Sequence, residues 1–283
     1  MVKGRLSGLK KRSPVVNGIF YPESPVAMIK KLSAWGLKEN YAASGGKTIL
    51  APHGAWELTG DIAARAFAGV QKRITGRKIN RVLMLGTYHH SSEEGIYLSE
   101  SSSFVTPLGD LKVDQELNYR LASCSTLIKA NDVPHLCEHS LEVLLPLVKF
   151  CFNDAMIVPI LMSGRKPALI SALAGALKIT MEDRIDETLI ILSSTISQNA
   201  DPVKAESMAK NFCELIGNND AGTYMSRLRE GRISACGGGL IGAMLESRLL
   251  GAKHFSPLLP MSQGKEDHGE TVYYGAFSDF EVP

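Results

Sequence analysis

Apolar residues fall in short runs along this chain, separated by longer amphipathic stretches. Four runs predict buried strands: residues 47–52 (KTILAP), 81–85 (RVLML), 156–162 (MIVPILM) and 188–192 (TLIIL). The stretches between them have helical spacing, for example residues 59–73, 114–125 and 140–151, and Thr59 is the predicted N-cap of the first. Strands that alternate with helices predict an α/β protein whose sheet is covered on both faces.

Two prolines predict irregularities in these elements. Pro146 falls within the 140–151 segment and should kink that helix. Pro159 falls within the 156–162 segment and cannot donate a ladder hydrogen bond, which predicts an edge strand or a bulge.

The composition is that of an ordinary globular protein. The chain has 283 residues, of which 45% are hydrophobic and 21% charged, and its formal net charge of +2 is too small to predict binding to nucleic acid or an anionic membrane. No apolar stretch is long enough for a membrane span. Five cysteines without a CxxC spacing favour reduced thiols and therefore the cytoplasm.

The chain shows no linker or repeat that would divide it. A basic N-terminal run, MVKGRLSGLKKR, offers little that can pack in a core. We therefore expect residues 1–11 to form a disordered tail and residues 12–283 to form a single domain.

Polar side chains gather where the predicted strands end, which is where ligands bind in open α/β sheets. His53 follows the first strand, His89 and His90 follow the second, and Cys236 precedes three glycines in SACGGG. Imidazole and thiolate are good transition-metal ligands, so His53, His90 and Cys236 are candidate ligands. The alternatives are that each histidine is a hydrogen-bonded structural residue and that the glycines only begin the next helix.

A second charged cluster, EHSLE, contains Glu138 and His139. An acid at a helix start is common on dipole grounds alone. In the functional interpretation, one of these two residues reaches the pocket to support a metal ligand or to contact substrate.

Seven blocks, in order, resemble the Memo family, which includes the AmmeMemoRadiSam system protein B proteins. They are VVNGIFYP, LAPHGAWELTG, LGTYHH, TPLGDLKVDQEL, EHSLEVLLP, LSSTISQ and SACGGGLIG. The resemblance implies a mixed central sheet flanked by helices, similar to the class III extradiol dioxygenases that use non-haem iron.

The resemblance also implies a metal site of two histidines and one cysteine. Carried over by motif, the ligands are His53, His90 and Cys236, with Fe(II) or Cu(I) as the expected metal and zinc as a further possibility. In this interpretation His90 faces the metal, and His89 points away to orient the loop or line the rim.

Three residues depart from the family pattern. Thr195 and Gln198 stand where the SSDxSH block has an acid and a histidine, and Trp56 replaces the usual tyrosine. Glutamine cannot exchange a proton near neutral pH, so the usual acid/base pair is missing. We expect these three residues to lie in or beside the pocket.

Two functions therefore remain open. The first is a metal-dependent redox or oxygenase-type protein with an unknown substrate. The second is a non-catalytic adaptor that uses the same pocket to bind a peptide or small molecule. The resemblance implies radical-SAM and AMMECR1-like proteins as partners. A hydrolase using Ser193 or Ser194 is a weaker third possibility, because no G-x-S-x-G context supports it.

Overall fold

A large mixed sheet forms the centre of the protein. The computed structural model describes residues 10–39, 47–72, 78–90, 93–250, 255–265 and 269–279. Across the sheet the strands are β11 (Ser256–Pro257), β14 (Phe277–Ser278), β2 (Lys47–Ala51), β9 (Thr188–Ser193), β3 (Arg81–Thr87), β8 (Met156–Ser163), β4 (Gly95–Leu98) and β7 (Ile128–Ala130). The predicted α/β architecture is confirmed.

The four middle strands, β2, β9, β3 and β8, are mutually parallel. Their carboxyl ends therefore meet at one edge of the sheet. Both faces are apolar, as alternation along β3 shows: Val82 and Met84 join one hydrophobic cluster, whereas Leu83 and Leu85 join the other. This explains why the central strands have continuous apolar sequences.

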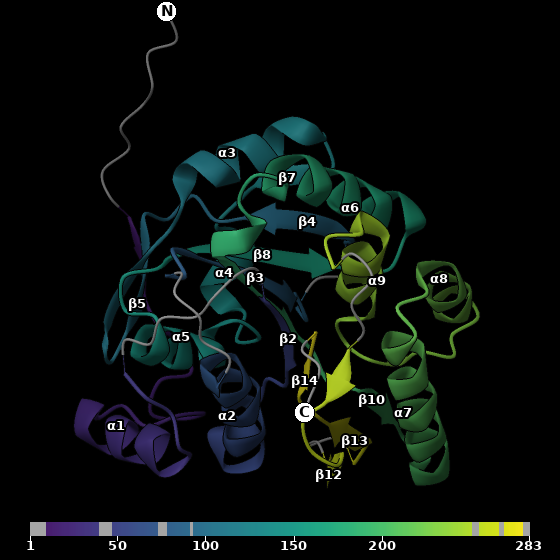
Figure 1. The fold of residues 1–283 in the computed structure, drawn as a ribbon, viewed down its shortest axis with the longest axis horizontal. Coiled ribbons are helices and arrows are strands. Elements are labelled where there is room, and N and C mark those ends of the chain that lie inside the picture. The colour runs from purple at the N-terminus through teal and green to yellow at the C-terminus, as the bar shows by residue number, and fades with distance from the viewer. Residues whose placement is uncertain are drawn as a thin grey trace, which may run out of the picture.

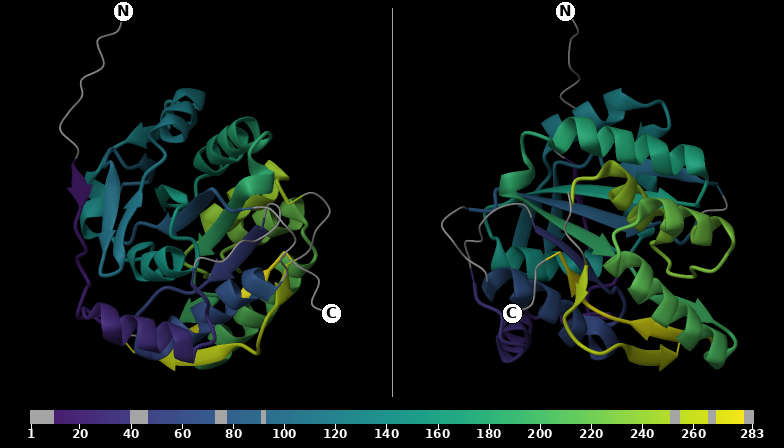
Figure 2. Two further views of the ribbon diagram at one scale, coloured as in Figure 1. Left: turned by 60° about the vertical axis from the view of Figure 1, so that its left-hand side comes forward. Right: turned by 45° about the vertical axis from the view of Figure 1, so that its right-hand side comes forward.

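Helices cover both faces of the sheet (Figures 1 and 2). One face packs against α2 (Trp56–Lys72) and α5 (Leu145–Cys151), with α1 (Pro25–Ala34) further out. On the other face lie α3 (Gln115–Cys124), α6 (Pro167–Met181), α7 (Pro202–Gly217), α8 (Ala221–Arg229) and α9 (Gly238–Ser247). The remaining helical segments are α4 (Val133–Cys137) and the short 3-10 turns Glu142–Leu144 and Ile185–Glu187.

Two small sheets flank the large one. The first contains β1 (Lys11–Arg12), β5 (Ser103–Thr106) and β6 (Gly109–Lys112). The second contains β10 (Ser197–Asn199), β13 (Thr271–Tyr274) and β12 (Ser262–Lys265), and it lies just beyond the carboxyl end of β9. This second sheet brings the C-terminal part of the chain to the edge where the parallel strands end.

The structure corrects the predictions made from the two prolines. β8 is paired on both sides, so the edge placement inferred from Pro159 is wrong. Pro159 is tolerated because the β4 ladder stops at Ile160 and the next bridge on that side is at Ile157, so no partner strand faces its nitrogen. Pro146 does not kink a helix, because α5 begins at Leu145 and places the proline in its first turn.

The ends of some predicted segments also differ. Thr59 is not an N-cap, because α2 already begins at Trp56. In the predicted tail, residues 1–9 lie outside the described residues, whereas Lys11 belongs to β1 and pairs with Ser103. Among the described residues, none of the helices is long and apolar enough to cross a membrane.

Candidate metal centre

A cavity of about 480 Å³ opens at the carboxyl edge of the parallel strands. His53 lies two residues after β2, His89 two residues after β3, and Cys236 two residues before the start of α9. All three side chains line this cavity, together with His139. Four potential metal ligands from distant parts of the chain therefore converge on one space.

The hydrogen bonds of His53 determine which ring nitrogen faces the cavity. Its Nδ1 lies 2.8 Å from Ser193 Oγ, and the Ser193 hydroxyl donates its only proton to the Ser140 carbonyl at 2.6 Å. The hydroxyl can therefore only accept from His53, so Nδ1 carries the proton. His53 Nε2 is left facing Cys236 Sγ, 3.4 Å away.

Glu138 holds His89 in the same manner. The buried Glu138 carboxylate accepts the His89 backbone N–H at 2.6 Å and lies 3.0 Å from His89 Nδ1. It also accepts the backbone N–H groups of His139 and Ser140. Burial would raise the pKa of Glu138, but the hydrogen bond from His89 and the positive charge of His89 lower the pKa to about 2. An ionised carboxylate on Nδ1 directs His89 Nε2 into the cavity.

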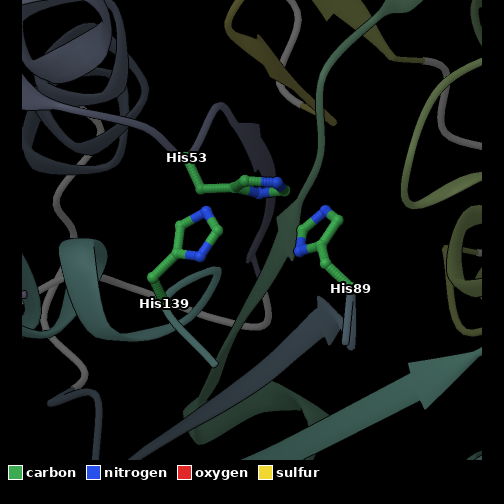
Figure 3. Close-up of side chains that lie close together, drawn as sticks. All are labelled: His53, His89 and His139. Carbon is green, nitrogen blue, oxygen red and sulfur yellow. The ribbon is translucent and has the colours of Figure 1, made fainter. Parts of the chain in front are cut away.

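Three imidazole rings face one another across the cavity (Figure 3). One ring nitrogen from each of His53, His89 and His139 lies within 4.8 Å of the other two. The His89 and His139 rings stack with centroids 5.3 Å apart. Burial, together with the charge of His53, lowers the pKa of His139 to about 4, so its ring is neutral near pH 7. His139 also forms a second possible metal-binding group with His90 and Glu138. In that group the Glu138 carboxylate already accepts four hydrogen bonds.

Cys236 is held as an anion. Its Sγ accepts the Thr195 backbone N–H at 3.1 Å and the Thr195 hydroxyl at 3.3 Å. Burial would raise the pKa of Cys236, but the charge and hydrogen bonds of His53 and His89 lower it well below its usual value. Burial would likewise lower the pKa of His89, but its bonds to Cys236 and Glu138 raise it to about 10. A thiolate already paired with imidazole protons is suited to metal binding, because a metal ion can replace those protons.

The loop that carries Cys236 is fixed from two sides. Arg165 donates from Nη1 to the Ile233 carbonyl at 2.8 Å and from Nη2 to the Ala235 carbonyl at 3.0 Å. On the other side, the Gly237 N–H donates to Ser194 Oγ at 2.9 Å. Both contacts hold the backbone on either side of the sulfur.

The structure places two of the three predicted ligands, His53 and Cys236, in the cavity. The orientation predicted for the histidine pair is reversed, because His89 lines the cavity and His90 does not. The physical reason is Glu138, which binds both the backbone and the ring of His89 and so fixes which member of the pair turns inward.

The other predicted residues are divided between the cavity and its surroundings. Thr195 and Gln198 line the cavity, and Gln198 donates its amide to Glu270 Oε2 at 2.5 Å. Trp56 does not line it, because its indole is buried beside Tyr21 and donates to the Val143 carbonyl at 2.9 Å. Trp56 follows Ala55, which does line the cavity, so Trp56 lies behind the cavity wall rather than in it.

Sequence reasoning missed six further residues of the cavity wall: Phe20, Gly54, Ala55, Leu58, Lys265 and Tyr274. Phe20 had a signal, since it belongs to the VVNGIFYP block, and its ring contacts His139 edge-on at 5.2 Å. The hairpin of β12 and β13 brings Lys265 and Tyr274 to the cavity, and no motif indicated this.

Comparison with known proteins gives one consistent family. The family described as Memo-like protein matches residues 12–272. A MEMO1 family protein of Desulfurococcus amylolyticus is 26% identical over 261 residues, covering 87% of this chain and 90% of the relative. Those of Methanobrevibacter smithii and Nitrosopumilus maritimus are 25% and 26% identical, covering 92% and 94% of this chain and 95% and 98% of the relatives. This chain belongs to the Memo-like protein family.

Proposed function

We propose that this protein binds a redox-active transition metal, iron or copper, through His53, His89 and Cys236. The observation that carries the proposal is the convergence of three imidazoles and one thiolate on a single cavity. The ring nitrogens lie within 4.8 Å of one another, and Cys236 Sγ lies 3.4 Å from His53 Nε2. Two neutral nitrogen donors and one thiolate form a donor set that iron, copper and zinc accept in proteins.

His89 takes the place that the sequence assigned to His90 in this ligand set. Its Nδ1 is occupied by Glu138, in the arrangement by which a carboxylate orients a metal-binding histidine. His139 adds a fourth nitrogen at the same cavity and is available either as a further ligand or as part of the wall. Bound iron or copper would supply one-electron redox chemistry at a site with room for a small molecule.

A non-catalytic binding role for the same pocket is the second candidate, and Thr195 and Gln198 favour it. Neither side chain can act as an acid or base near neutral pH. The Gln198 amide is also engaged in a hydrogen bond to Glu270. Oxidoreductase activity with an unknown substrate remains our first proposal because the donor set is complete without these two residues.

The ligand set is tested by anaerobic titration with Co(II), Fe(II) and Cu(I), following the sulfur-to-cobalt charge-transfer band for the first. We expect near one-to-one binding. We expect His89→Gln and Cys236→Ser each to weaken it by more than about 100-fold, since loss of an outer partner alone typically costs 10- to 100-fold.

Neighbouring residues supply the matched controls. His90→Gln changes the other member of the histidine pair, and Cys137→Ser changes an exposed cysteine outside the cavity. Both variants should titrate as the parent does. Loss of binding in His90→Gln with normal binding in His89→Gln would return the ligand role to His90. A parent protein that binds none of the three metals would refute the proposal altogether.

A further inference from the structure

The wall of the cavity combines two kinds of side chain. His53, His89 and Cys236 are potential metal ligands, whereas Phe20, Leu58 and Tyr274 add apolar surface. The volume of about 480 Å³ is in the range of small-molecule sites. The Leu58 side chain remains 54% exposed although it lies at the cavity. A ligand with an apolar body would cover these groups.

A lysine adds positive charge to this cavity. Lys265 is the last residue of β12 and lines the cavity, and it makes no ion pair with any other residue in the described ranges. No Asp or Glu in the described part of the chain lines the same cavity. The nearby Glu270 carboxylate accepts the Gln198 amide instead. A cation that pairs with no carboxylate of the described residues, in the wall of a partly apolar cavity, is complementary to an anionic ligand.

We propose that the pocket binds a small organic anion whose apolar body packs on Phe20, Leu58 and Tyr274 and whose carboxylate pairs with Lys265. This inference rests on the proposed function, because it names the ligand of the same pocket. In this arrangement His53, His89 and Cys236 hold the metal and Lys265 holds the carboxylate, so the ammonium of Lys265 fixes the orientation of the ligand in the pocket.

The inference is tested with 3-phenylpropanoate and its neutral analogue 3-phenylpropanamide. Binding of each is measured by calorimetry to the full chain, first as purified and then after loading with Co(II). We expect the acid to bind about fivefold more tightly than the amide, as a partly exposed ion pair allows. Lys265→Met should remove this preference and the accompanying dependence of affinity on salt.

Lys112→Met is the matched control, because Lys112 is also the exposed last residue of a four-residue strand, β6, but lies away from the cavity. It should keep the preference for the acid. Equal binding of acid and amide to the parent, or an unchanged preference in Lys265→Met, would overturn the inference. Inorganic phosphate binding as tightly as phenylpropanoate would also overturn it, because the apolar body would then contribute nothing.

The titration with Co(II) separates this inference from the proposed function. Acid-selective binding that depends on Lys265, in a chain that binds no cobalt, would refute the metal site and leave the anion site standing. Normal cobalt binding without preference for the acid would refute the anion site alone.

Discussion

Thr195 determines how electron-rich the Cys236 sulfur is. Its hydroxyl donates to Sγ at 3.3 Å and accepts the Cys236 N–H at 3.2 Å, so the two residues are joined by reciprocal hydrogen bonds. Hydrogen bonds to a metal-bound thiolate withdraw charge from it and tune the potential of the metal. A carboxylate at this position would repel the thiolate, whereas the hydroxyl stabilises it.

We therefore predict that Thr195→Val, which removes the hydroxyl at nearly constant volume, shifts the sulfur-to-cobalt band to longer wavelength. The folded state should also lose about 1 kcal/mol, as expected for one hydrogen bond. Thr195→Ser keeps the hydroxyl and should leave the band at its parental position. A band that shifts in the serine variant but not in the valine variant would contradict this role.

Individual site residues were predictable to different degrees. His53 and Cys236 were found because each lies next to an element that the apolar pattern reveals. The sequence could not show whether His89 or His90 faces the cavity, since strand alternation predicts only that one of two neighbours does so. Glu138, which decides between them, is 49 positions away along the chain.

At the scale of elements, the loop before α9 places the Cys236 sulfur by close packing against the end of β9. A Cβ built on Gly237 would lie 2.8 Å from Ser194 Cβ and 3.2 Å from the Ser193 carbonyl oxygen. The backbone of Gly237 has φ −81°, which any residue adopts, so the constraint on this glycine is steric. Side chains of any size would push the loop away from β9.

Gly237→Ala is accordingly expected to destabilise the fold by about 1–3 kcal/mol, as overpacking does, and to weaken cobalt binding by displacing the sulfur. Urea unfolding and the cobalt titration measure the two effects. Gly175→Ala in α6 is the control, because a Cβ there meets nothing within 4 Å. It should stabilise the helix by about 0.5–1 kcal/mol and leave metal binding unchanged. Equal stability of the two variants would show that the loop is not tightly packed.

The central strands could be predicted from sequence because burial on both faces requires continuous apolar runs. The strand β12 could not, since SQGK has neither an apolar run nor alternation. Its position depends on antiparallel pairing with β13, in which Lys265 lies opposite Thr271. Long-range pairing of this kind produces no local sequence pattern. For that reason Lys265 and Tyr274 were not predicted to line the cavity.

At the scale of the whole molecule, residues near the start of the described chain contact the segment that carries Glu138. The buried Arg12 donates to the carbonyls of His135 and Glu138 and forms an ion pair with Glu142 at 2.5 Å. Glu142 in turn accepts the hydroxyl of Tyr21 at 2.8 Å. The segment that carries Glu138 is thus fixed by residues more than 120 positions earlier, a connection that joins β1 to the candidate metal centre.

This buried region also makes the stability of the domain dependent on pH. The His135 ring is 2% exposed, its Nε2 lies 3.2 Å from the Tyr97 carbonyl oxygen, and burial lowers its pKa to about 4. In the unfolded chain the pKa is about 6.5. Between these values the unfolded state binds the proton more readily, so the contribution of neutral His135 is complete above about pH 6.5 and lost as the pH falls toward 4.

We predict that this loss amounts to about 3 kcal/mol at most, from a pKa difference of roughly 2.5. The measurement is urea unfolding of the metal-free protein at pH 7, 6, 5 and 4, for the parent and for His135→Gln, whose amide can still donate to Tyr97 but does not titrate. His139 has a similarly lowered pKa and titrates in both proteins, so only the difference between their curves reports on His135. The difference in unfolding free energy, parent minus variant, should decrease as the pH falls. Parallel curves would show that protonation of His135 does not destabilise the folded state.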